Sequence, residues 1–177
     1  MKFFKTRPVK ENLSARFRPV ADVFAMRREG DVYVAEVRAS PERAVELFHE
    51  LSEMMPEVVD LALDCVRTGR NYVGEGLHLS EVTDTIARMK VALAASGGVE
   101  LSVYTAEEQL CLSPMLELWI YAKSDRWLYL LLGRGLEERA TLPAREWRIR
   151  AAEFSGAPEL VDAVTAAAER LTLKLGS

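Results

Sequence analysis

Two closely spaced glycines are the residues of this sequence best suited to hold a charged cofactor. Gly74 and Gly76 follow a predicted strand and precede a predicted helix that Ser80 can cap. Glycine lets a backbone approach a phosphate closely, and a helix N-terminus favours anions. The third glycine of the dinucleotide fingerprint and the Gly-Lys-Ser/Thr of a P-loop are both missing. Gly74, Gly76 and Ser80 are therefore a candidate cofactor site, with a plain loop as the alternative interpretation.

The same stretch resembles a coenzyme A turn. GNAT acetyltransferases hold the pyrophosphate of coenzyme A with the pattern Arg/Gln-x-x-Gly-x-Gly/Ala, and residues 71–76 are Asn-Tyr-Val-Gly-Glu-Gly. Asn71 stands at the Arg/Gln position, and Glu75 lies where the phosphate would bind. The resemblance does not extend to the strands predicted after residue 98. It implies a transferase that uses coenzyme A, or another phosphate-bearing cofactor such as a nucleotide, at residues 74–80.

The other reactive side chains form no catalytic or metal-binding pattern. His49 and His78 are the two histidines, and they form no His-x-x-x-His pair. Each lies three residues after a glutamate, Glu46 or Glu75, which supplies two potential ligands where zinc takes three or four closely spaced ones. Cys65 and Cys111 form no Cys-x-x-Cys pair, and we expect both to be buried thiols. No Gly-x-Ser-x-Gly elbow occurs. The leading interpretation therefore has no catalytic residues, no metal and no cofactor.

An aromatic hairpin is the strongest indication of a binding surface. Residues 115–132 are predicted to form two strands joined by a two-residue turn, and in that register Trp119 faces Leu130 while Tyr121 faces Leu128. Both faces of such a pair are apolar, although an antiparallel sheet in a small domain commonly leaves one face in water. Either helices cover both faces, or the face with these four side chains meets a protein partner, a second copy of the chain or a small apolar ligand.

The first half of the chain alternates strands and helices. Residues 23–38 contain two β-rich stretches around a Glu-Gly-Asp turn, and a helix with Ser40 as its cap runs from there towards Pro56. A half-buried strand follows over residues 57–66. Asp60 and Asp64 share its polar face but lie about 13 Å apart at the usual strand rise, which is too far for paired-carboxylate chemistry.

The second half is dominated by strands. Residues 67–76 are predicted as a loop, and the helix capped by Ser80 ends at the Gly97-Gly98 stop. Residues 99–133 have a strand pattern throughout, a weaker strand covers residues 145–151, and Pro158 begins the last helix. Short connections between consecutive strands predict an α+β fold: an antiparallel or mixed sheet with a long C-terminal meander and about three helices packed on it.

Length and charge define the domain organisation. The chain of 177 residues fits one domain, which we assign to residues 19–177, preceded by a basic N-terminal arm over residues 1–18. Residues 1–20 hold six basic side chains and one acidic side chain, so their net charge is +5. Because the net charge of the whole chain is −4, the residues after 20 carry −9. The arm could contact an anionic partner, with a solvated terminus as the alternative.

The same charge distribution, together with hydropathy, excludes several classes of partner. Nucleic-acid-binding domains carry a basic face on the body itself, so we do not expect nucleic acid binding. No apolar run approaches the roughly 20 residues of a membrane span. The N-terminal residues also lack the apolar segment of a secretory signal. We therefore expect a cytoplasmic protein without a membrane anchor.

Two functions are consistent with these patterns. The leading hypothesis is a non-catalytic binding or interaction protein, of the adaptor or immunity type, that uses the aromatic face at Trp119, Tyr121, Leu128 and Leu130 to bind a protein partner or to form a homodimer. The alternative is a transferase that binds coenzyme A or a nucleotide at Gly74, Gly76 and Ser80.

Overall fold

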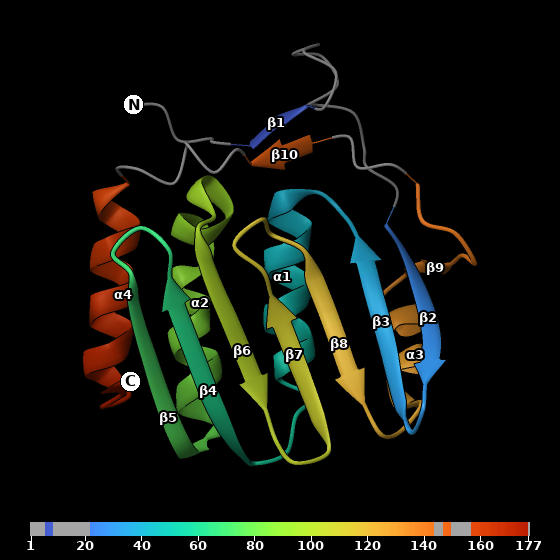
Figure 1. The fold of residues 1–177 in the computed structure, drawn as a ribbon, viewed down its shortest axis with the longest axis horizontal. Coiled ribbons are helices and arrows are strands. Elements are labelled where there is room, and N and C mark those ends of the chain that lie inside the picture. Colours follow the sequence, from blue (N-terminus) through green and yellow to red (C-terminus); the bar gives the residue numbers. More distant parts are fainter. Residues whose placement is uncertain (1–5, 9–21, 144–146, 150–156, 177) are drawn as a thin grey trace.

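The computed structural model describes residues 6–8, 22–143, 147–149 and 157–176. Nine of the described strands form one sheet in the order β11-β5-β4-β6-β7-β8-β3-β2-β9 (Figure 1). Their bounds are β2 (Val23–Glu29), β3 (Val32–Arg38), β4 (Val58–Cys65), β5 (Arg70–His78), β6 (Val99–Tyr104), β7 (Glu108–Leu112), β8 (Leu118–Ala122), β9 (Glu137–Glu138) and β11 (Lys174–Leu175). Neighbouring strands are antiparallel except β2 and β9, which are parallel. The predicted α+β class, with a mixed sheet and a β6-β7-β8 meander, is confirmed.

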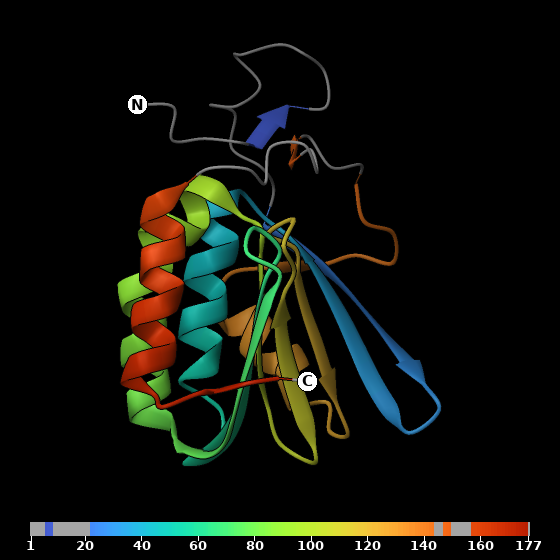
Figure 2. The same ribbon diagram turned by 60° about the vertical axis from the view of Figure 1, so that its left-hand side comes forward.

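The helices cover one face of this sheet. The described residues contain α1 (Pro41–Ser52), α2 (Leu79–Ser96), α3 (Arg126–Gly133) and α4 (Pro158–Arg170). In Figure 2, α4, α2 and α1 form a layer on one side of the sheet, and none of the described helices lies on the other side. None of the described helices is long and apolar enough to cross a membrane.

Alternation along the strands explains why the core lies between the sheet and the helices. In β4, Leu61 and Leu63 point towards the helices and are at most 2% exposed, whereas Asp64 points away and is exposed. The α1 stripe of Val45, Phe48 and Leu51 meets them from the other side, and each of these side chains is at most 1% exposed. Burial of a side chain of this size contributes about 1.5–3 kcal/mol.

The predicted helix starts agree with the structure at α1 and differ at α2. The Ser40 side chain accepts a hydrogen bond from the backbone N–H of Arg43 at 3.2 Å, as expected for an N-cap. The cap position of α2 is His78, so Ser80 lies inside the helix and makes no cap there. The Gly97 stop of α2 is confirmed, and its φ of +57° is a conformation that glycine adopts readily.

The largest correction concerns residues 126–132, which form helix α3 and not the second strand of a hairpin. A short apolar run has no period that separates a buried strand from a buried helix, and leucine is a good helix former. The helical spacing buries Trp127 and Leu131 together, with both side chains 0% exposed. This helix brings the number of described helices to four, one more than predicted.

A second correction concerns residues 67–76, because residues 70–78 form strand β5 and not a loop. The predicted strand over residues 145–151 is confirmed for β10 (Trp147–Ile149). It pairs with β1 (Thr6–Pro8) in a separate two-stranded sheet. The rest of the expected arm, apart from these three residues, lies outside the described part of the chain.

A buried carboxylate fastens α3 to the sheet. Glu108 of β7 accepts hydrogen bonds from the Trp127 indole at 2.9 Å and from Arg126 Nη2 at 2.5 Å, and its side chain is 9% exposed. Arg126 also stacks over the Trp127 ring, 4.7 Å from its centroid, and donates to the carbonyl oxygen of Met54, just beyond α1. The cluster therefore joins β7, α3 and the end of α1.

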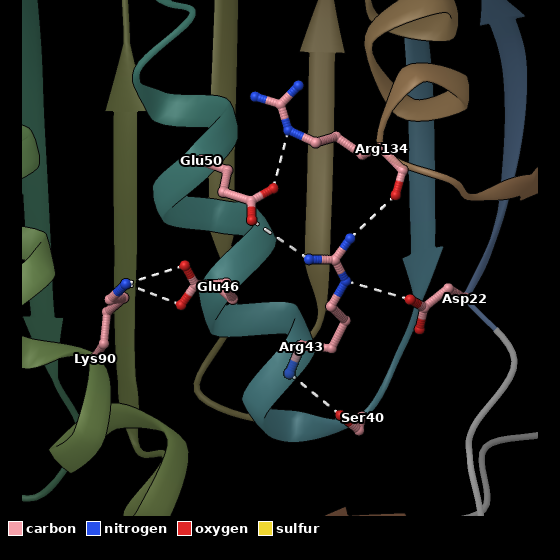
Figure 3. A network of polar contacts seen from close by, with 7 residues as sticks. All are labelled: Asp22, Ser40, Arg43, Glu46, Glu50, Lys90 and Arg134. Atoms are coloured by element: carbon pink, nitrogen blue, oxygen red, sulfur yellow. Dashed lines mark hydrogen bonds and ion pairs between the residues drawn. The ribbon is translucent and has the colours of Figure 1, made fainter.

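Arg43 joins the other end of α1 to its neighbours (Figure 3). Its guanidinium contacts the carboxylates of Asp22 at 3.2 Å and Glu50 at 3.5 Å, and donates to the carbonyl oxygen of Arg134 at 3.1 Å. Arg134 returns a bond of 2.9 Å to Glu50. These contacts fix the end of α3 and the start of β2 against α1.

We predict that Glu108→Ala destabilises the protein by about 2–4 kcal/mol, because it leaves the buried Trp127 N–H without an acceptor and unpairs Arg126. Urea unfolding followed by circular dichroism measures the loss. Glu107→Ala is the matched control: that side chain is 67% exposed in its pair with Lys123, so its removal should cost under about 1 kcal/mol. Equal losses for the two variants would contradict the structural role of Glu108.

Candidate functional site

The sheet face that points away from the helices is the candidate site, and we call it the open face. No described helix lies over it, and Figure 1 looks onto it. Its side chains alternate along each strand with those of the core. They include Ala25, Arg27, Val34, Glu36, Arg38, Asp60, Ala62, Asp64, Val73, Glu100, Ser102, Tyr104, Gln109, Cys111, Trp119, Tyr121 and Lys174.

The middle of the open face combines a large aromatic side chain with small neighbours. Strand register places Trp119 opposite Cys111, Cys111 opposite Ser102 and Ser102 opposite Ala62. Trp119 is partly exposed, whereas Ser102 is 4% exposed between its neighbours. The row therefore combines one indole with three small side chains, and Glu36 of β3 lies on the other side of Trp119.

A parallel row adds two tyrosines and an amide. Tyr121 lies opposite Gln109, Gln109 opposite Tyr104, and Tyr104 opposite Asp60. The Gln109 amide donates to the Ser102 hydroxyl at 3.2 Å, which joins the two rows. Tyr121 is 38% exposed. Tyrosine and tryptophan side chains that present both ring surface and polar atoms are typical of protein interfaces.

Carboxylates gather on the β4–β6 half of the open face. Asp64 and Glu100 lie directly opposite each other on neighbouring strands and are both exposed. Asp60 lies further along β4 and accepts a hydrogen bond from the Gly76 N–H at 2.8 Å. Among the described residues, no Lys, Arg or His side chain lies within ion-pair distance of Asp60, Asp64 or Glu100.

The carboxylates affect the titration of their neighbours. Burial, and then the charges of Asp60 and Glu75, raise the pKa of the Tyr104 phenol above its ordinary value. Burial raises the pKa of the Cys111 thiol, and the charge of Glu100 adds to that effect while a hydrogen bond with Ser102 opposes it. Cys111 therefore stays a neutral thiol, which is a poor nucleophile.

The four residues predicted to share one aromatic face are divided between two faces. Trp119 and Tyr121 lie on the open face, because they alternate along β8 with the buried side chains of Leu118, Ile120 and Ala122. Leu128 and Leu130 belong to α3, on the helix side of the sheet, where they pack against the core. The predicted register is wrong for these two leucines because a helix, and not a strand, follows β8.

The glycines of the predicted cofactor site have local structural roles. A Cβ at Gly74 would lie 2.5 Å from Leu173 Cδ2 and 2.9 Å from Leu77 Cδ1, so glycine allows the segment after α4 to pack closely. Gly76 has a φ of +63°, at the bulge between β4 and β5, and its N–H is already bound to Asp60.

Ser80 belongs to the first turn of α2, whereas both glycines belong to β5. It lines an open hollow of about 560 Å³ beside the first turn of α2, together with His78, Glu53 and Glu57. Two carboxylates in such a space disfavour a phosphate, because like charges repel across a short distance. Gly74 and Gly76 thus belong to β5 and Ser80 to α2, and phosphate binding by these three residues stays a prediction.

The remaining candidates are also dispersed. Among the described residues, no three His, Cys, Asp or Glu side chains gather closely enough to hold a metal ion. Cys65 is buried as predicted, whereas Cys111 is only partly buried on the open face. Sequence analysis missed Tyr104, Gln109 and Glu100 as members of one surface, because their proximity depends on strand order. Comparison with known proteins finds no matching family model, no matching curated protein and no matching solved structure.

We predict that Asp60→Asn lowers the pKa of Tyr104 towards the ordinary tyrosine value near 10, because one of the charges that oppose phenolate formation is removed. Tyr104 favours its neutral form in the folded state, so its contribution to stability is present below about pH 10 and is lost as the pH rises through the raised pKa. Phenolate absorbance, assigned by comparison with Tyr104→Phe, measures the titration. Asp31→Asn, at the exposed β2–β3 turn, should leave it unchanged. A pKa that stays the same in Asp60→Asn would contradict the assigned cause.

Proposed function

We propose that the protein is a non-catalytic binding module whose open face binds a protein partner. The observation that carries this proposal is that the described helices cover one side of the sheet only, whereas Trp119, Tyr121 and Tyr104 lie on the other side. A sheet face that only contacted water would be expected to carry mainly charged and small polar side chains. An indole and a phenol on β8 and a second phenol on β6 supply the anchors on which protein interfaces depend.

The chemistry of the face supports binding more than catalysis. The Cys111 thiol is held in its neutral form, and His49 lies on α1, on the helix side of the sheet. Among the described residues of this face, no side chain pair combines a nucleophile with a general base at hydrogen-bond distance. We place the protein in the cytoplasm, because Cys65 and Cys111 are free thiols that do not pair with each other.

We predict that Trp119→Ala abolishes partner capture while the fold is retained, because Trp119 is a partly exposed anchor. The wild-type protein and the variant are immobilised, and the proteins recovered from native lysate are compared by mass spectrometry. Tyr129→Ala is the matched control: this aromatic side chain on α3 is 66% exposed and lies on the other side of the sheet. Partners that are retained by all three proteins would contradict the proposal.

A second copy of the chain and a small cofactor are the competing occupants. Light scattering of wild type and Trp119→Ala shows whether the captured partner is another copy, in which case the variant is of lower oligomeric order. Thermal unfolding with coenzyme A and with nucleotides tests the transferase alternative, since a ligand at a hundred times its Kd stabilises a protein by about 2.7 kcal/mol. A shift of that size would favour an enzyme over a binding module.

A further inference from the structure

We infer that the partner of the open face is a cationic protein segment, rich in arginine or lysine, which lies across the carboxylates of β4 and β6 and against the aromatic side chains of β6 and β8. This inference rests on the proposed function and names the chemistry of the partner. It is carried by the distribution of paired and unpaired charge over the face.

The basic side chains of the open face are largely neutralised within it. Arg27 pairs with Glu29 and Arg38 pairs with Glu36, each at 2.5 Å, at the β2–β3 end. Lys174 lies at the opposite edge, on β11. The carboxylates of the β4–β6 half have no such partners among the described residues, so the charge that this half offers to a partner is negative.

The arrangement of Asp64 and Glu100 is unfavourable in the isolated protein. Like charges directly opposite each other on neighbouring strands destabilise a sheet, whereas opposite charges at the same positions stabilise it. The two carboxylates are exposed, and an arginine or lysine placed between them would turn a repulsive pair into an attractive triad. The rest of the chain adds to this attraction, because the part after residue 20 carries a net charge of −9.

The neighbouring aromatic residues suit the same partner. Tyr104 lies directly opposite Asp60 on the neighbouring strand, and on its other side Gln109 separates it from Tyr121. A guanidinium or ammonium group is attracted to the face of an aromatic ring as well as to a carboxylate. A cationic segment can therefore use both halves of the face, with its charged groups over β4 and β6 and its stems against the tyrosines and Trp119.

The test is a binding titration with two labelled peptides, an Arg-Ser repeat and a Glu-Ser repeat of the same length, followed by fluorescence anisotropy at low and moderate salt. The double variant Asp64→Asn with Glu100→Gln keeps side-chain shape and removes both charges. It should bind the Arg-Ser peptide about tenfold more weakly than wild type. The control, Asp162→Asn with Glu169→Gln, removes two exposed charges from α4 and should bind like wild type.

Thermal unfolding supplies a second, independent measurement. Because the double variant removes the repulsion between Asp64 and Glu100, its Tm should rise by about 1–3 °C while its peptide affinity falls. A merely structural role for these carboxylates would lower Tm and affinity together, which would overturn the inference. Equal weakening by the α4 control, or wild-type binding of the Glu-Ser peptide as tight as that of Arg-Ser, would overturn it as well.

The failure of this inference can be separated from failure of the proposed function. If Trp119→Ala loses its captured partners while the double variant keeps full affinity for the Arg-Ser peptide, the open face binds a partner but Asp64 and Glu100 do not recognise a cationic segment, and this inference alone fails. If neither variant changes capture or affinity, both proposals fail. If wild type proves to be a dimer that Trp119→Ala dissociates, the occupant is a second copy and the cationic partner is overturned.

Discussion

Burial of one sheet face, and of only one, is the constraint on which the structure depends. Each strand has a side-chain period of two, so the residues that fill the core under α1, α2 and α4 force the alternate residues onto the opposite face. Leu61 cannot be buried without turning Asp60 and Ala62 away from the helices. The residues of the open face therefore occupy the strand positions that alternate with the core positions. The aromatic side chains there do not fill the core between the sheet and the helices.

The polar clusters at the two ends of α1 maintain this arrangement. Glu108 ties α3 to β7 through Trp127, and Arg43 ties the end of α3 and the start of β2 to α1. Each cluster lies on the helix side of the sheet. The hydrogen bonds and ion pairs of these two clusters therefore join helices to strands. On the open face, Asp60, Asp64 and Glu100 form no ion pair with another described residue. That division is consistent with stability arising on one side of the sheet and recognition on the other.

The electrostatic and apolar features of the open face would act on the proposed partner in different ways. Carboxylates without cationic neighbours attract a partner over a distance set by salt screening, about 8 Å at physiological ionic strength. Trp119 and Tyr121 act only on contact, through the apolar area that they remove from water. A surface with both features can speed the approach of a partner and then stabilise the complex. The repulsion between Asp64 and Glu100 is tolerated because both side chains remain in water.

Local patterns in the sequence determined much of the fold. Ser40 and Pro41 start α1, the alternation around Leu61 and Leu63 defines β4, and Gly97 ends α2, because each of these signals acts within a few residues. Tertiary structure decided the rest. Residues 126–133 became a helix since Trp127 and Leu131 could be buried together against Glu108, and residues 70–78 became a strand since β4 and β11 pair with them. The meeting of Trp119, Tyr104 and Glu100 on one face also followed from strand order, because contacts between strands far apart in the chain leave no periodic signal in the sequence.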